Sequence, residues 1–90
     1  MQSKSSDLAM YLERVLERES SLEQLLRSPG SMAMVVEPCA GNLWHFAADQ
    51  DIRDRDPGYR DMQERAMRRL IELLREGASP EELAKVSFLG

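Results

Sequence analysis

Two side chains in this sequence are suited to nucleophilic or metal chemistry, the single cysteine Cys39 and the single histidine His45. A catalytic Cys–His pair also needs an orienting group and an oxyanion site, and a zinc site normally has four ligands. The sequence indicates neither arrangement around these two residues. We therefore expect no catalytic residues, no metal site and no cofactor, and a lone cysteine is typical of a reducing compartment.

Four aspartates lie close together in the middle of the chain, at Asp49, Asp51, Asp54 and Asp56. A calcium loop of the EF-hand type needs glycine at its sixth position and glutamate at its twelfth. Counted from Asp49, those positions hold Asp54 and Arg60, so the pattern fails. We expect residues 49–56 to form a solvated connector in which arginines offset the acids.

Four arginines form an apparent basic cluster in the second half of the chain: Arg65, Arg68, Arg69 and Arg75. On a helical wheel acidic residues interleave with them on one face. The spacing predicts i,i+4 ion pairs for Asp61–Arg65, Glu64–Arg68 and Arg68–Glu72. A solvated face is the favoured interpretation, and a phosphate- or carboxylate-binding face is the alternative.

The overall charge argues against one large class of partner. The net charge is −4. Residues 1–30 carry four basic and five acidic side chains, residues 31–56 two and five, and residues 57–90 six and six. No segment has the net basic charge on which non-specific nucleic-acid binding depends. The sequence also lacks a signal peptide and an apolar run long enough to span a membrane, so we expect a cytoplasmic protein.

The first 30 residues have helical periodicity. Residues 1–5 are expected to be frayed, with a helix beginning near Ser6 and ending at Ser28-Pro29-Gly30. The acidic residue Glu19 interrupts the apolar stripe, and Ser20 follows with capping-box spacing. We favour a continuous or slightly kinked helix, and the alternative is a break and restart near Ser20.

The middle of the chain predicts strands. Residues 32–36 and 43–48 are short apolar runs, separated by a stretch that contains proline, glycine and asparagine. These features favour a β-hairpin. In such a hairpin Trp44 and Phe46 point the same way, because side chains alternate along a strand. We expect both rings to pack on helices, and the alternative is an aromatic contact surface.

The C-terminal third has the clearest helix signals. Asp56-Pro57 predicts a helix start, and Gly77 predicts its end just after Glu76. Ser79-Pro80 is typical of a second, short helix start.

Residues 70–86 read Leu-Ile-Glu-Leu-Leu-Arg-Glu-Gly-Ala-Ser-Pro-Glu-Glu-Leu-Ala-Lys-Val. This stretch resembles the first half of the helix-turn-helix found in many bacterial regulators and recombinases. The resemblance implies a helix–turn–helix corner and a possible DNA-binding role. In that family a recognition helix follows and reads base edges. Here the sequence stops at Gly90, so the segment from Ser79 to Gly90 is expected to be at most a relic of the motif.

Together these patterns predict one α+β domain over residues 1–90, mainly helical, with an N-terminal helix, a β-hairpin, a long C-terminal helix and a short final helix. We expect a homodimer, because small domains of this kind leave apolar surface uncovered. The favoured function is a small non-enzymatic regulatory or adaptor protein acting through protein–protein contacts. The alternative is a DNA-binding transcriptional regulator. The candidate partner or dimer contacts are Trp44, Phe46, Tyr11, Arg65 and Arg69.

Overall fold

The computed structural model describes residues 3–88. In this part of the chain the backbone is helical and contains no strand, so the predicted α+β fold with a β-hairpin is wrong. The elements in chain order are α1 (Lys4–Leu16), α2 (Leu22–Arg27), the 3-10 turn η1 (Gly30–Met32), α3 (Ala33–Val36), the 3-10 turn η2 (Glu37–Cys39), α4 (Ala40–Ala48), α5 (Gln50–Arg55), α6 (Pro57–Glu76) and α7 (Pro80–Ala84).

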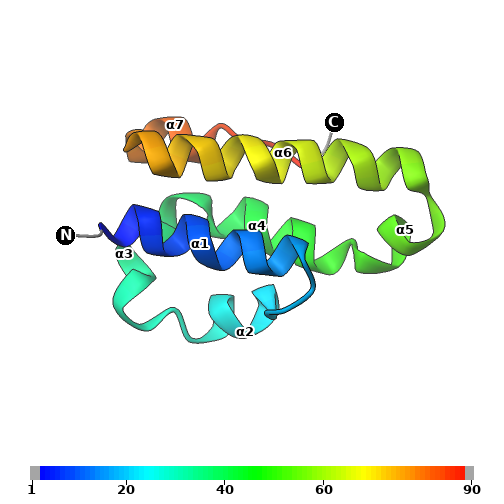
Figure 1. The fold of residues 1–90 in the computed structure, drawn as a ribbon, viewed down its shortest axis with the longest axis horizontal. Helices are drawn as coiled ribbons and strands as arrows, with labels where there is room; N and C mark the ends of the chain where they lie inside the picture. The colour runs from blue at the N-terminus through cyan, green and yellow to red at the C-terminus, as the bar shows by residue number, and fades with distance from the viewer. Residues whose placement is uncertain (1–2, 89–90) are drawn as a thin grey trace.

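The two longest helices, α1 and α6, lie side by side and antiparallel (Figure 1). The shorter elements from α2 to α5 complete the other side of the molecule, and α7 turns back along α6 (Figure 1). No helix among residues 3–88 is both long enough and apolar enough to cross a membrane. The arrangement places one apolar core between α1, α4 and α6.

The core is built from the apolar stripes of these helices. α1 contributes Leu8 and Leu12, and α6 contributes Met67, Leu70 and Leu74, all of them fully or almost fully buried. Their spacing of three or four residues puts them on one face of each helix. Burial of such side chains contributes roughly 1.5–3 kcal/mol each to folding, before the loss of chain entropy.

The segment predicted as a hairpin is a series of short helices. Its buried residues are Val36, Cys39, Leu43 and Phe46, which are spaced by three, four and three residues, as on one side of a helix. Its two apolar runs are short, and periodicity alone does not separate short buried strands from short buried helices. Because a helix turns by 100° per residue, Phe46 faces the core whereas Trp44 faces outward, and the predicted shared face is wrong.

The first helix ends earlier than expected. α1 stops at Leu16, and Arg18 adopts a left-handed conformation with φ 63°. α2 then begins directly after its N-cap, Ser21, whose hydroxyl accepts a hydrogen bond from the Gln24 amide at 3.2 Å. The expected continuous helix is therefore wrong, and the alternative of a break near Ser20 is confirmed.

The start of α1 also differs from expectation. The N-cap is Ser3, whose hydroxyl accepts from the Ser6 amide at 3.1 Å, so Ser6 already lies inside the helix. Of the predicted frayed residues 1–5, Lys4 and Ser5 are helical and Ser3 is the cap, while residues 1–2 lie outside the described part of the chain.

The C-terminal helix signals are confirmed. Asp56 caps α6 by accepting from the Tyr59 amide at 3.1 Å, with Pro57 as the first helical residue. Gly77 ends α6 with φ 74°, a left-handed conformation that favours glycine. Ser79 caps α7 by accepting from the Glu82 amide at 3.3 Å. These signals succeed because each depends on a few neighbouring residues only.

Candidate functional site

The predicted connector at residues 49–56 holds the most deeply buried charge of the described chain. Most of it forms α5, and the Arg53 side chain reaches inward until the residue is only 5% exposed. Its guanidinium donates to the Phe46 carbonyl oxygen, to Gln63 Oε1 at 2.6 Å and to Gln50 Oε1 at 3.0 Å. It also lies 3.7 Å from the centre of the Phe46 ring. The expectation of a solvated connector is therefore wrong for Arg53.

The second half of this cluster comes from α6. Gln63 is 0% exposed, and its amide nitrogen lies 2.9 Å from Asp49 Oδ2, 3.1 Å from the Tyr59 hydroxyl and 3.0 Å from the Phe88 carbonyl oxygen. The Tyr59 hydroxyl donates to the same Asp49 oxygen at 2.6 Å. We call Asp49, Arg53, Tyr59 and Gln63 the polar clasp, because they join α5, α6 and the segment around Phe88.

The electrostatics of the polar clasp suit a structural role. The hydrogen bond from Tyr59 lowers the pKa of Asp49, and the same bond raises the pKa of Tyr59. Burial lowers the pKa of Arg53. A carboxylate with a lowered pKa is a weak general base. Among the described residues no buried side-chain nitrogen or oxygen lacks a hydrogen-bond partner, so the buried polar atoms of the clasp are all paired within the chain.

Cys39 and His45 lie in different surroundings. Cys39 is buried, and its thiol donates to the Val35 carbonyl oxygen at a sulfur–oxygen distance of 3.6 Å. Burial raises its pKa to about 11, so the thiol is protonated and a poor nucleophile at neutral pH. The partly exposed His45 has its Nε2 3.4 Å from Asp49 Oδ2. Within residues 3–88 no three His, Cys, Asp or Glu side chains are grouped closely enough to hold a metal ion.

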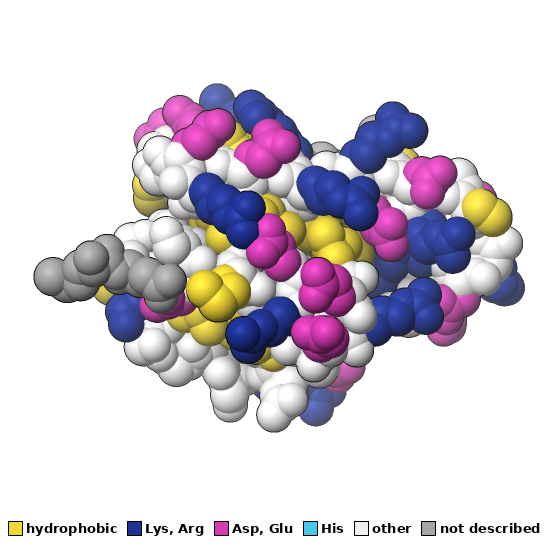
Figure 2. Space-filling model, in the orientation of Figure 1, with side chains coloured by type: hydrophobic (Ala, Val, Ile, Leu, Met, Phe, Trp, Pro, Cys, Tyr) yellow, Lys and Arg dark blue, Asp and Glu magenta, His cyan; other side chains and the backbone are white. Residues whose placement is uncertain are grey.

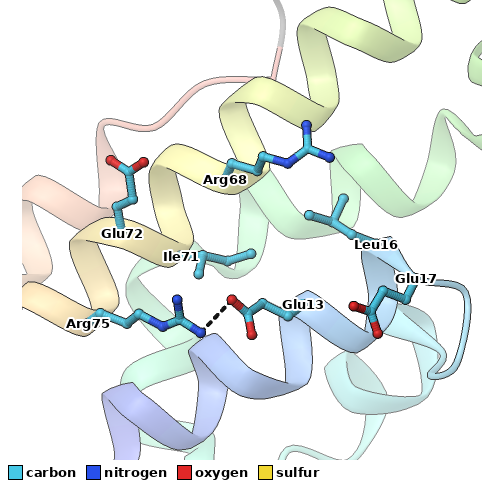
Figure 3. Close-up of a pocket in the computed structure, with 7 residues that line it drawn as sticks. All are labelled: Glu13, Leu16, Glu17, Arg68, Ile71, Glu72 and Arg75. Atoms are coloured by element: carbon cyan, nitrogen blue, oxygen red, sulfur yellow. Dashed lines mark hydrogen bonds and ion pairs between the residues drawn. The ribbon is translucent and has the colours of Figure 1, made fainter.

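A groove of about 430 Å³ runs between α1 and α6. Its lining residues are Glu13, Leu16, Glu17, Arg68, Ile71, Glu72 and Arg75. Figure 3 shows Leu16 and Ile71 between the two rows of charged side chains, and the ion pair of Arg75 with Glu13 bridges the helices. Figure 2 shows the same face, where basic and acidic groups alternate along both sides of an apolar seam. Because basic and acidic groups alternate, this surface favours neither an anionic nor a cationic ligand.

The predicted ion pairs along α6 do not form in the described structure. Arg69 pairs with Glu72 at 3.4 Å, and Arg75 pairs with Glu13 of α1. Neither arginine uses an acid four residues away. The sequence therefore predicted the charged face of α6 correctly, but the predicted ion pairs on that face are wrong. Arg65 and Arg69 are both exposed on this face.

Two other predicted contact residues, Phe46 and Tyr11, make contacts within the chain itself. Phe46 is buried, with its ring edge-on to Phe88 at a centroid distance of 5.3 Å. Tyr11 is half-buried, and its hydroxyl donates to the Ser21 carbonyl oxygen at 2.7 Å. That hydrogen bond spans the turn between α1 and α2. Tyr11 and Phe46 therefore serve the fold of a single chain.

Trp44 is placed differently. It is 40% exposed on the outer side of α4, where Gly41 and Ala48 are also exposed. We call these three residues the α4 outer face. Asn42 fixes one flank of α4 by donating to the carbonyl oxygens of Ala84 and Val86 at 3.1 and 2.6 Å, and α2 packs against α4 as well.

The α4 outer face lies in a stretch with almost no charge. Residues 28–48 contain one charged side chain, Glu37, although 31% of all residues in the chain are charged. Two further exposed apolar side chains belong to the neighbouring helices, Met34 of α3 at 86% and Ile52 of α5 at 39%. Sequence reasoning missed this surface, although the uncharged stretch and its helical spacing were visible in the sequence.

Comparison of this chain with protein-family models, with curated proteins and with solved structures gave no match.

Proposed function

We propose that this chain is a small non-enzymatic regulatory or adaptor protein that acts through protein–protein contacts, as a homodimer in the cytoplasm. One observation carries the proposal: the single tryptophan of the chain lies exposed at the centre of the uncharged α4 outer face. Tryptophan is enriched among the residues that dominate binding energy, and charged residues are depleted at interface cores.

The polar groups support the same choice over an enzyme. The buried Cys39 thiol is protonated at neutral pH. Asp49 and Tyr59 are hydrogen-bonded to each other and to Gln63. An active site instead needs a nucleophile or base that reaches a substrate within hydrogen-bond distance.

Affinity capture from the native host tests the proposal. Immobilised parent chain, Trp44→Ala and Met10→Ala are compared; Met10 is a control because it is also 40% exposed, but on α1. We expect a specific set of captured proteins that Met10→Ala retains and Trp44→Ala loses, with both variants folded by circular dichroism. Capture that survives Trp44→Ala unchanged would remove the support for this surface.

A DNA-binding regulator is the second candidate, favoured by one observation. Residues 70–86 span the end of α6, a turn at Gly77 in the left-handed conformation, and α7 with Ser79 as its cap. Against it, α7 has only five residues, and no recognition helix follows within the described residues. Phe88, just beyond α7, is instead buried.

Salt dependence separates the two candidates. Binding to DNA tightens steeply as salt is lowered, because each phosphate contact releases counterions. A largely apolar protein contact changes little over the same range. A duplex-binding titration at two salt concentrations therefore supports the regulator only if affinity rises steeply at the lower salt.

A further inference from the structure

A cavity lies where the turn after α1 meets α4, α5 and the start of α6. Its narrow part has a volume of about 50 Å³, which is room for one small ion or a few waters. A wider recess of about 330 Å³ adjoins it, and the two parts share the lining residues Val15, Arg18, Phe46, Gln50 and Arg53. No residue of the α4 outer face lines either part, so the cavity is separate from the proposed protein contact.

The narrow part is basic, although the whole chain has a net charge of −4. Arg18, Arg53 and Arg60 line it together with one acid, Glu64, so three positive charges and one negative leave a local charge of +2. No ion pair joins any of these three arginines to a carboxylate among residues 3–88. In Figure 2 several basic side chains lie close together at this end of the molecule, where α1 ends and α6 begins. The local charge is the complement of a dianion.

Arg53 is the most deeply buried of the three arginines, with only 5% of the residue exposed. Its three hydrogen bonds go to neutral acceptors and use three of the five N–H donors of a guanidinium. Asp49 and Asp54 attract its charge, but the Asp49 carboxylate accepts from Tyr59 at 2.6 Å. The Asp54 carboxylate accepts from Gln50 at 2.9 Å. Because buried charges in folded proteins are normally paired, this one indicates that an anion completes the site.

Arg18 occupies a position where glycine is the ordinary residue. It follows the end of α1 with φ 63°. Its amide donates to the Val15 carbonyl oxygen at 3.1 Å, and the Glu19 amide donates to the Arg14 carbonyl oxygen at 2.8 Å. A helix that ends with this hydrogen-bond pattern most often has glycine at the left-handed position, because a side chain there strains the backbone. The Arg18 side chain lines both parts of the cavity, and binding an anion there gives it a role that the turn does not require.

We propose that this chain binds a phosphate group in the narrow part of the cavity, held by the guanidinium groups of Arg18, Arg53 and Arg60. Guanidinium groups bind phosphate through charge-assisted hydrogen bonds, often in pairs. A phosphate monoester carries a charge of about −1.5 to −2 at pH 7, which matches the local charge of the cavity. The ligand is free phosphate or a small phosphomonoester, whose organic part would lie in the wider recess beside Ser20 and Ser21.

The test is a titration of the full chain with inorganic phosphate, followed by NMR of the arginine side-chain Nε–H signals. Sodium chloride at equal ionic strength is the control. We expect saturable shifts of the Arg18, Arg53 and Arg60 signals with phosphate only, with a dissociation constant on the order of 0.1–1 mM for so small a ligand. A second titration uses glycerol phosphate. Tighter binding than that of inorganic phosphate identifies a phosphomonoester as the ligand, and equal or weaker binding identifies free phosphate.

The decisive variant is Arg18→Gly, because it removes one cation and suits the left-handed backbone. We expect it to weaken phosphate binding about tenfold, as for the loss of one charge-assisted contact, while its urea midpoint stays equal to that of the parent or rises. Arg60→Gln should weaken binding to a similar degree. Arg65→Gln is the matched control, since Arg65 is an exposed arginine of α6 that lines neither part of the cavity. The proposal is overturned if phosphate shifts the signals no more than chloride does, or if either Arg18→Gly or Arg60→Gln binds phosphate like the parent.

Discussion

Trp44 and Arg53 lie on successive helices. The tryptophan lies at the surface, where an arginine would be expected, and the arginine lies in the interior, where a tryptophan would be expected. The tryptophan of α4 is 40% exposed, whereas the arginine of α5 is 5% exposed. Arg53 lies on α5, seven residues after Phe46 in the sequence, and it is accommodated in the interior by three acceptors and an aromatic ring. The Trp44 side chain makes no hydrogen bond and no ring contact with residues 3–88.

The contrast shows that, in this part of the chain, the position of a residue on its helix decided its burial more than its residue type did. A buried charge must find partners for its hydrogen-bond donors, so the polar clasp is explained by the fold. An exposed tryptophan on an uncharged helix face is not explained by the fold, and we therefore propose a contact with a partner for it. The predictions below test the two sides of this contrast, from the largest expected effect to the smallest.

Phe46→Ala should lower the free energy of unfolding by about 3–5 kcal/mol, the usual cost of removing a buried aromatic ring. The ring packs on Phe88 and lies under the Arg53 guanidinium, so both contacts are lost with it. Urea denaturation followed by circular dichroism measures the change. A loss below about 1 kcal/mol, as for an exposed residue, would contradict the placement of Phe46 in the core.

Gln63→Leu should destabilise the chain by about 3 kcal/mol, because the buried Arg53 loses an acceptor and the Phe88 carbonyl loses a donor. The control is Gln24→Leu on the exposed side of α2, with an expected change within about 0.5 kcal/mol. Equal denaturation midpoints for the two variants would show that the clasp does not stabilise the fold.

The polar clasp should also make the free energy of unfolding depend on pH in the acidic range. Because the pKa of Asp49 is lowered in the folded state, its ionised form stabilises the fold above the ordinary value of 3.8, and this contribution is lost as pH falls below that value. Carbon NMR titration of the Asp49 carboxyl should show a midpoint below 3.8 in the parent. In Tyr59→Phe the midpoint should rise, since the largest cause of the shift is removed. An identical midpoint in both proteins would contradict the assigned hydrogen bond.

Trp44→Ala should lower the free energy of unfolding far less than Phe46→Ala or Gln63→Leu, by about 1 kcal/mol or less in dilute protein, because its outer side contacts solvent. The comparison is with Phe46→Ala, two residues away and measured in the same way. If Trp44→Ala costs as much as Phe46→Ala, then Trp44 belongs to the core and the contrast between the two regions fails.

The sequence predicted the local features of the fold well. The caps at Asp56 and Ser79 and the end of α6 at Gly77 are each determined by a few adjacent residues. The break between α1 and α2 was visible only as an alternative, because the leucines on both sides of Glu19 share one face. The hairpin was wrong because short apolar runs fit a strand and a helix equally well.

The candidate site was harder to predict than the fold. Gln63 lies four residues after Tyr59 and four before Met67, so it lies on the buried side of α6, but its polarity argued against burial. Arg53 is buried through contacts with residues of two other elements, α4 and α6, which local patterns do not encode. Trp44 was identified from its residue type, and only the helical geometry showed that it faces outward.

The most direct test of the central claim uses Trp44 itself, since it is the chain's only tryptophan and lies at the proposed contact. Acrylamide quenching of its fluorescence is measured in dilute protein. An exposed Trp44 predicts a red-shifted emission that acrylamide quenches readily. A blue-shifted emission that acrylamide quenches only weakly would place Trp44 in the core and contradict the account.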